Sequence, residues 1–184
     1  DGHIRLRNGL AKSKNLVAIR VLKSIGAPYA QDYASRFGFD PANHPAYLSM
    51  GLGVGSATLI EMVTAYGVFA NGGYLKKPYL IEKMVDSQGQ VIDQTNTMFQ
   101  NEETPRVIDP RNAFIMTTLL QDVVNKGTAQ KAKALGRSDI AGKTGTTNNQ
   151  VDAWFAGYTP SQVAIAWIGF DQPKSLGKDE TGSQ

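Results

Sequence analysis

The sequence has no cysteine among its 184 residues and only two histidines, His3 and His44. The absence of cysteine excludes a disulfide scaffold, a thiolate nucleophile and any cysteine-ligated zinc or iron–sulfur centre. Two histidines are too few for a multi-histidine metal site. We therefore expect no metal centre built on cysteine or on several histidines.

Long apolar runs and concentrated charge are also missing. No stretch reaches the about 18 apolar residues that a membrane-spanning helix needs, and no signal-peptide pattern opens the chain. The net charge of +3 is spread along the sequence instead of forming a basic stripe with aromatic residues, so nucleic acid is not an expected partner. A content of 41% hydrophobic and 19% charged residues is typical of a folded protein. We predict that residues 1–184 form a single domain.

The spacing of apolar residues changes from helical to alternating near Ile140. Helical segments followed by a block of strands predict an α+β fold. The predicted elements are helices over residues 16–25, 29–37, 59–70 and 110–126, a hairpin over 79–93, a polar loop over 96–104, and strands over 151–158 and 162–170. The predicted helix signals are an Asn15 cap, a Gly26 and Pro28 stop, a Thr58–Glu61 capping box, an Asp109–Pro110 start and a Gly127 stop.

The most distinctive segment, residues 142–147, reads Gly-Lys-Thr-Gly-Thr-Thr on the first strand of the terminal sheet. Lys143 supplies a cation, Thr144 and Thr146 alternate on one strand face, and Gly145 leaves the space between them open. Such an edge can offer hydroxyls and a backbone N–H to a peptide that bears a carboxylate. A threonine-rich edge strand with a solubilising lysine gives the same pattern, so this triplet alone does not indicate a site.

Ser13 and Asn15 form a Ser-x-Asn element just ahead of a predicted helix, which by itself is only a capping sequence. Taken with Lys143, however, it supplies two of the three elements of active-site serine penicillin-recognising enzymes: Ser-x-x-Lys, Ser-x-Asn and Lys-Thr-Gly. The hypothesis requires Ser13 and Lys143 to meet in space beside a groove. The glycine-rich residues 51–56 lack the spacing of a phosphate-binding loop and are predicted to be a flexible entry to a helix.

With these motifs in order, the chain resembles the transpeptidase domain of class A, 1A-type penicillin-binding proteins along essentially its whole length. The matching segments are residues 10–20, 51–53, 70–73, 127–129, 142–147, 152–160 and 167–171. The resemblance implies the fold shared by penicillin-binding transpeptidases and serine β-lactamases, an antiparallel sheet with helices plus an all-helical lobe. We expect the chain to be the C-terminal part of such a domain, truncated at both ends.

The third family element, Ser-x-x-Lys, carries the nucleophile and its base and precedes Ser-x-Asn. This sequence opens at Asp1, without a methionine, after the place where that element belongs. A literal match, Ser175 to Lys178, follows the last strand in a polar tail, and we reject it because the family places the nucleophile at the start of a buried helix. We therefore expect a piece of a longer parent, with no nucleophile in this chain.

The resemblance implies acyl transfer from a D-Ala–D-Ala stem peptide to an amine through a serine acyl-enzyme, with inhibition by β-lactams and no cofactor. Ser13 and Lys143 would be catalytic, as a proton shuttle and its partner. The residues implied to bind substrate are Asn15, which orients the peptide, Thr144 and Thr146, which bind the carboxylate, and Gly145 between them. The backbone N–H of Thr146 would serve the oxyanion hole.

The remaining expectations concern partners and alternatives. The implied parent carries a glycosyltransferase domain and is anchored on the outer face of the bacterial inner membrane. Trp154, Phe155, Tyr158 and Trp167 are interpreted as core and sheet packing, and Asp152 as a structural hydrogen-bonding residue. Two other functions stay open: a carboxypeptidase or β-lactamase on the same scaffold, and a non-catalytic sensor that only grips a carboxylated ligand.

Overall fold

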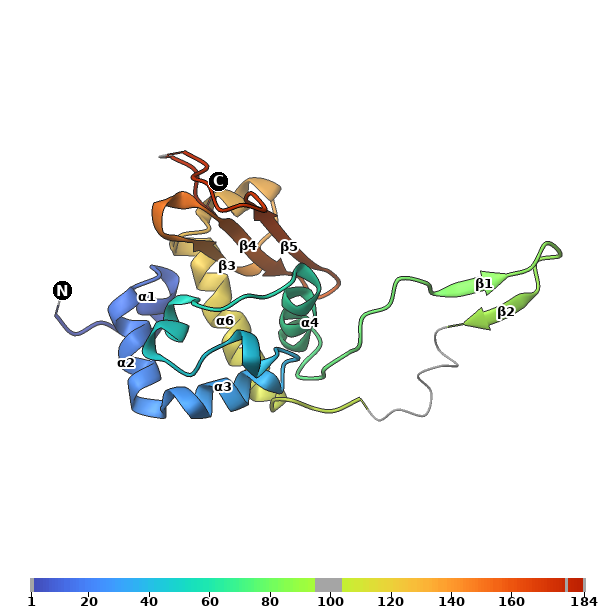
Figure 1. Ribbon diagram of the computed structural model, residues 1–184, viewed down its shortest axis with the longest axis horizontal. Coiled ribbons are helices and arrows are strands. Elements are labelled where there is room, and N and C mark those ends of the chain that lie inside the picture. The colour runs from blue at the N-terminus through green and yellow to red at the C-terminus, as the bar shows by residue number, and fades with distance from the viewer. Residues whose placement is uncertain (1, 95–103, 178, 184) are drawn as a thin grey trace.

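The computed structural model describes residues 2–94, 104–177 and 179–183 (Figure 1). Most of the polar loop expected over 96–104 lies outside the described residues. The longer helices are α1 (Leu6–Ala11), α2 (Asn15–Ile25), α3 (Ala27–Ser35), α4 (Leu59–Ala70) and α6 (Pro110–Lys126). The strands are β1 (Lys83–Val85), β2 (Val91–Gln94), β3 (Ala141–Thr146), β4 (Ala153–Tyr158) and β5 (Val163–Ile168). Short 3-10 turns are η1 (Pro41–Asn43), η2 (Leu48–Leu52), η3 (Gln130–Leu135) and η4 (Asn148–Gln150).

Helix α6 organises the core. Its start follows the predicted signal, because the Asp109 carboxylate accepts a hydrogen bond from the Arg111 N–H and Pro110 occupies the first turn. Its buried residues are Ala113, Leu120, Val123 and Val124, which share one face at helical spacing. The C-terminal half packs against the sheet in a cluster that includes Ile140 and Tyr158. The N-terminal half joins a second cluster with Phe37 and Val68, so one helix connects the sheet to the other helices.

The terminal sheet has the order β3-β4-β5, with both pairs antiparallel. Lys143 pairs with Ala156, and Gly145 pairs with Trp154, which pairs in turn with Trp167. Because side chains alternate along a strand, Lys143 and both tryptophans lie on one face of the sheet. The turn between β4 and β5 is closed by a 2.8 Å hydrogen bond from the Thr159 N–H to the Gln162 carbonyl. These strands confirm the predicted α+β organisation.

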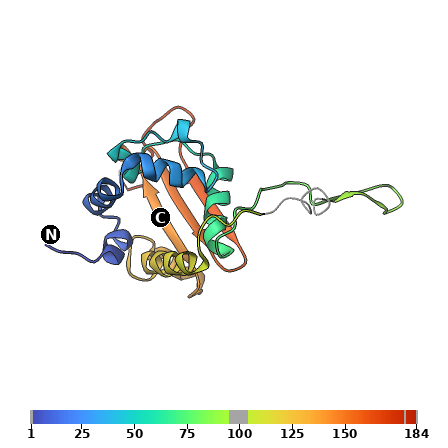
Figure 2. The same ribbon diagram turned by 90° about the horizontal axis from the view of Figure 1, so that it is seen from below.

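Strands β1 and β2 form an antiparallel hairpin, as predicted, although its strands are shorter than expected. Its turn is closed by the Asp86 carboxylate, which accepts the N–H groups of Gln88 and Gln90. Gly89 adopts a φ of +80°, a conformation that glycine accepts at little cost. Two perpendicular views show this hairpin extending away from the rest of the protein as an arm (Figures 1 and 2).

Several helix ends differ from the sequence prediction. Asn15 is the first residue of α2 and not its cap, and Lys14 takes the cap position without a side-chain capping hydrogen bond. Pro28 lies in the first turn of α3, because that turn needs no N–H from proline. Gly26, with a φ of +90°, is the only residue between the two helices.

Helix α4 begins with the predicted capping box, in which Thr58 and Glu61 exchange hydrogen bonds. The spacing of apolar residues predicts a covered face of Leu59, Met62, Val63, Tyr66 and Phe69, and this prediction is partly wrong. Leu59 is 45% exposed, whereas Val68, which was not assigned to that face, is fully buried. Tertiary packing on the Phe37 cluster, which the periodicity cannot specify, decides which stripe of this mostly apolar helix is covered. No helix within the described ranges combines the length and apolarity that crossing a bilayer requires.

The contact between α1 and α6 depends on a glycine. A Cβ placed on Gly127 would lie 2.1 Å from the carbonyl oxygen of Ala11. This close approach, and not a positive φ, is what requires glycine, because Gly127 has a φ of −110°. The end of α1 therefore rests directly on the backbone that follows α6.

We predict that Gly127→Ala lowers the free energy of unfolding by about 1–3 kcal/mol, because the added methyl group overpacks this contact. Gly67→Ala is the matched control, since Gly67 lies inside α4 with nothing within 4 Å of an added Cβ. That change should raise stability by about 0.5–1 kcal/mol. Urea unfolding of both variants measures the difference, and equal effects would contradict this account of Gly127.

Candidate active site

The structure brings together two residues that lie 130 positions apart in the sequence. The Lys143 Nζ donates a hydrogen bond to the Ser13 Oγ at 2.9 Å. It donates a second bond, of 2.7 Å, to the carbonyl oxygen of Thr144. The close approach of the Ser-x-Asn loop to the Lys-Thr-Gly strand, which the hypothesis required, is therefore present.

Ser13 has an unusual backbone conformation, with a φ of +50°. It follows α1 in a Schellman-type ending, in which the Ser13 N–H bonds the Leu10 carbonyl and the Lys14 N–H bonds the Gly9 carbonyl. Glycine is the usual residue at this position, and a residue with a side chain pays about 1 kcal/mol for it. The sequence contained no sign of this turn, because the expected glycine is replaced by the serine whose hydroxyl meets Lys143.

Lys143 is largely withdrawn from solvent, and its burial lowers the pKa of the ammonium below the ordinary value of 10.5. Within the described residues, its Nζ donates to a hydroxyl and to a carbonyl, which are neutral acceptors. An ammonium carries three N–H groups, so one remains for an anionic ligand. The Lys143 ammonium is therefore a positive group with little access to water, and these two bonds use only two of its three N–H groups.

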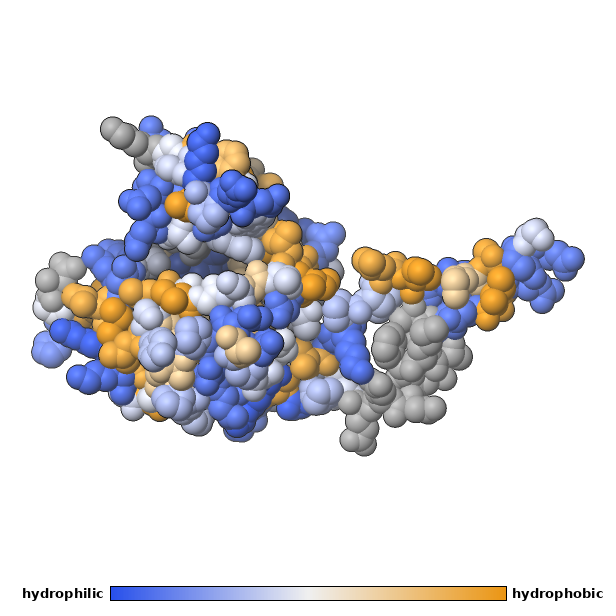
Figure 3. All heavy atoms as spheres, in the orientation of Figure 1, coloured by the Kyte–Doolittle hydropathy of each residue, from blue (hydrophilic) through white to orange (hydrophobic). Residues whose placement is uncertain are grey.

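Lys143 stands between two hollows. One, of about 450 Å³, is lined by Ser13 and Asn15 together with apolar residues of α1 and α2. The other, of about 730 Å³, is lined by Gly145 and Thr146 of β3 and by the segment that leads into α4. The space-filling view shows the molecule recessed between the sheet and the helices (Figure 3). This position gives a ligand access to the Lys143 and Ser13 pair from either side.

The two threonines of β3 are not equivalent. Thr146 lines the larger hollow, and its hydroxyl accepts the N–H of Gly182 at 3.0 Å. Thr144 lines neither hollow, and its hydroxyl lies 2.6 Å from that of Thr128, just after α6. Sequence reasoning missed Thr128, because its pairing with β3 depends on how α6 packs against the sheet.

The aromatic residues divide into two groups. Phe155 and Tyr158 pack in the α6 cluster, as interpreted from the sequence. Trp154 and Trp167 instead line the larger hollow, with ring centroids 6.1 Å apart. A Cβ on Gly145 would lie 3.3 Å from the Cβ of Trp154, so that glycine leaves room for the ring. The strand register places both tryptophans on the face of Lys143, but whether that face borders a hollow depends on how the helices pack against the sheet.

Asp152 has the structural role expected for it. Its carboxylate accepts the indole N–H of Trp167 at 2.9 Å, and its backbone N–H donates to the Thr147 hydroxyl at 2.7 Å. These bonds fix the Trp167 ring against the hollow. Asp152 therefore helps to shape the site, and neither of these hydrogen bonds joins it to Lys143.

The segment over residues 51–56 does more than enter α4. It contains the end of η2, and Gly53 to Ser56 line the larger hollow. His44 lines the same hollow, and its Nε2 is buried without a hydrogen-bond partner. Within the described part of the chain, no three histidine or acidic side chains gather as a metal ion would need.

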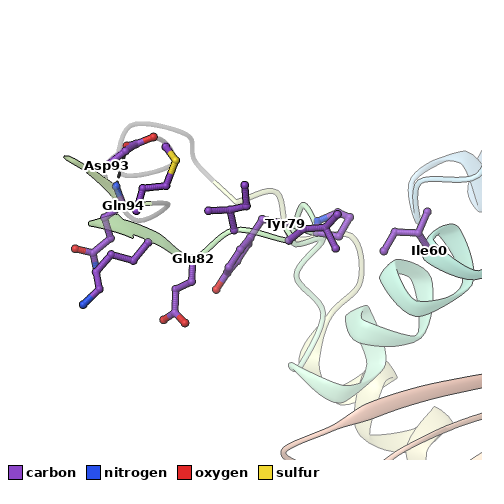
Figure 4. Close-up of a pocket in the computed structure, with 10 residues that line it drawn as sticks. Ile60, Tyr79, Glu82, Asp93 and Gln94 are labelled. Carbon is purple, nitrogen blue, oxygen red and sulfur yellow. Dashed lines mark hydrogen bonds between the residues drawn. The ribbon is translucent and has the colours of Figure 1, made fainter. Parts of the chain in front are cut away.

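Two other features are separate from this site. Ser175 lies in a tail segment without helix, where its hydroxyl accepts the Gly177 N–H, and Lys178 is outside the described residues. A third hollow, of about 680 Å³, lies between Ile60 of α4 and the arm (Figure 4). It is lined mainly by the apolar residues 78–81, and Leu80 there is fully exposed. The Lys143 and Ser13 pair is not among its lining residues.

Comparison with known proteins gives a consistent result. Residues 1–183 match the family model described as the penicillin binding protein transpeptidase domain. Penicillin-binding protein 1A of Neisseria lactamica is 54% identical over 178 residues, which are 97% of this chain and 22% of that protein. The chain thus spans about a fifth of the length of such relatives.

Solved structures agree. The crystal structure of penicillin-binding protein 1A from Haemophilus influenzae has a TM-score of 0.93 at 34% identity, covering all of this chain and 32% of that one. PonA1 from Mycobacterium tuberculosis, solved with penicillin V, has a TM-score of 0.77 at 24% identity, covering 95% of this chain and 50% of that one. The penicillin-binding transpeptidase fold expected from the sequence is therefore confirmed.

We predict that Ser13→Gly is more stable than Ser13→Ala by about 1 kcal/mol, because only glycine relieves the positive φ. Both variants lack the hydroxyl, so the difference isolates the backbone conformation. Urea unfolding measures it. Equal stability of the two variants would contradict the strain assigned to Ser13.

We also predict a pH dependence for Lys143. Because its folded pKa is lowered, the folded protein releases this proton at a lower pH than the unfolded chain does, and stability rises as the pH increases toward 10.5. Relative to Lys143→Met, the wild type should gain stability as the pH rises toward 10.5, the pKa of the unfolded chain's lysine. Urea unfolding of both at each pH tests this. A difference that stays constant or changes in the opposite sense would exclude the assigned shift.

Proposed function

The chain belongs to the penicillin-binding protein transpeptidase family, and from this premise we propose that it is part of a peptidoglycan D,D-transpeptidase. In this proposal residues 1–184 form one unit, the C-terminal part of the transpeptidase domain of a longer class A parent. The observation that carries the proposal is the 2.9 Å hydrogen bond between Lys143 and Ser13 beside the two hollows.

The proposed reaction is acyl transfer between stem peptides. A serine of a Ser-x-x-Lys element, supplied by the parent outside this chain, attacks the D-Ala–D-Ala carbonyl and forms an acyl-enzyme while the terminal D-Ala leaves. An amine of a second stem then attacks this ester and forms the cross-link, which releases the serine. A β-lactam enters the first step in place of the donor and remains attached.

Ser13 and Lys143 are the proposed proton-transfer groups. The departing amine must gain a proton. The Ser13 hydroxyl can donate one, because its oxygen accepts a hydrogen bond from Lys143 and its own O–H stays available. Lys143 can in turn resupply Ser13, since burial makes its ammonium a more ready proton donor than an exposed lysine. The same positive charge favours a site for the substrate carboxylate.

The substrate is proposed to lie along β3, one of the two edge strands of the described three-stranded sheet. The Thr146 hydroxyl already accepts the Gly182 N–H, so its own proton is available to a carboxylate. Gly145 would provide the open space beside Trp154, and Asn15 an amide from the opposite wall. The Thr144 hydroxyl is not part of this proposal, because it lies 2.6 Å from the Thr128 hydroxyl and Thr144 lines neither hollow. The Thr146 N–H is proposed as one oxyanion donor, whose loss typically costs about 3 kcal/mol in the transition state.

The partners follow from this proposal. They are D-Ala–D-Ala stem peptides, amine acceptors, β-lactams, and the rest of the parent with its glycosyltransferase domain. The parent would be anchored at the inner membrane and act on its periplasmic side. A hydrolase or a non-catalytic sensor on this scaffold is less favoured, because the curated relatives with high identity are penicillin-binding proteins 1A.

We predict that the full-length protein is labelled covalently by a fluorescent penicillin. Ser13→Ala and Lys143→Ala should each slow this acylation about 10²- to 10⁴-fold through loss of proton transfer. Ser24→Ala and Lys133→Ala are matched controls, since both residues are exposed and neither lines the two hollows beside Lys143. Wild-type labelling rates in the Ser13 and Lys143 variants would refute their roles.

A second arm of the experiment tests where the nucleophile lies and what accepts the acyl group. Residues 1–184 alone should show no labelling, because the nucleophile is proposed to lie outside them. Labelling of this chain alone would place the nucleophile within it. Transfer of a stem peptide to an amine would support the transpeptidase, and transfer only to water would support a hydrolase.

A further inference from the structure

We propose that Thr128 is a positioning residue that sets the separation between Ser13 and Lys143. This inference rests on the proposed function, in which these two side chains exchange protons. Thr128 directly follows Gly127, where α6 ends, and touches both segments that carry the pair. It reaches one segment through its backbone and the other through its side chain.

The backbone of Thr128 holds the serine side. Its N–H donates a 3.1 Å hydrogen bond to the carbonyl oxygen of Ala11. Ala11 is 1% exposed and precedes Ser13 by two residues, at the end of α1. The absence of a side chain on Gly127 allows this approach. The beginning of the turn that carries Ser13 is thereby fixed to the end of α6.

The side chain of Thr128 holds the lysine side. Its Oγ1 lies 2.6 Å from the Oγ1 of Thr144, the residue after Lys143. Lys143 itself is tied to the same residue by its 2.7 Å bond to the Thr144 carbonyl. A chain of contacts therefore runs from Ala11 through Thr128 to Thr144, parallel to the direct bond between Ser13 and Lys143.

These two contacts of Thr128 matter because the turn that carries Ser13 and the strand β3 are far apart along the chain. A hydrogen bond weakens steeply beyond normal length, and a misplacement of about 1 Å in a reacting group can cost about a hundredfold in rate. Without the Thr128 hydroxyl, β3 can shift relative to the end of α1 even though both still pack on α6. Thr128 thus acts through Ser13 and Lys143 and needs no contact with substrate.

The test compares Thr128→Val, which removes the hydroxyl but keeps the shape and the backbone N–H, with Thr128→Ser, which keeps the hydroxyl. Thr117→Val is a matched control. The Thr117 hydroxyl also joins α6 to the sheet, through a 2.8 Å contact with the Tyr158 hydroxyl and a bond to the Ala113 carbonyl, but away from Ser13. The full-length protein carries each change, and its melting temperature and rate of acylation by a fluorescent penicillin are measured.

We expect Thr128→Val to acylate about 10- to 100-fold more slowly than wild type, Thr128→Ser to stay within about twofold, and Thr117→Val to lower the melting temperature without slowing acylation. Unchanged acylation in Thr128→Val, or equal slowing in Thr117→Val, would overturn the inference.

A crystal structure of full-length Thr128→Val tests the positioning without any reaction. We expect its Ser13 Oγ and Lys143 Nζ to lie beyond hydrogen-bonding distance, and a separation still at 2.9 Å would overturn the inference. If penicillin does not label the wild-type protein, the proposed function is wrong. The distance between Ser13 Oγ and Lys143 Nζ in Thr128→Val would still decide the role of Thr128.

Discussion

The hydrogen bond from Lys143 to Ser13 is the interaction on which the site depends. It joins a strand near one end of the chain to a loop near the other, and neither residue has a chemical role alone. A solvated lysine would gain little from such a bond, because water competes for the same donors. Burial removes that competition and lowers the pKa of the ammonium, so one environment provides both the attraction and the readiness to release a proton.

The bond is possible because glycines let α1 approach both α6 and α2 closely. Gly127 has no Cβ where the Ala11 carbonyl lies, and Gly9 has none where Val17 packs. These contacts place the end of α1 beside the start of η3, within reach of β3. Close packing of this kind tolerates few side-chain changes, so the position of the site is set by the packing of helices that carry none of its reactive groups.

Stability and chemistry compete at Ser13. The turn after α1 favours glycine, yet serine occupies it and holds a φ of +50°. Strain that persists at one residue is commonly associated with function, because the surrounding structure must maintain it. Here the Schellman bonds of α1 hold the backbone while Lys143 holds the hydroxyl. The strained turn points the Ser13 side chain toward β3. A residue with an ordinary helical backbone would not need this strain.

The sequence by itself determined the helices with clear start and stop signals, the positions of the terminal strands along the chain, and the two motifs of the site. The capping box at Thr58 and the start of α6 at Asp109 were predictable because such signals act within a few residues. Only the tertiary structure decided that Trp154 and Trp167 line a hollow, that Val68 is buried in α4, and that Thr128 meets Thr144. These outcomes depend on which faces of separate elements pack together. That choice is made by the free energy of the whole core, and no local pattern of residues contains it.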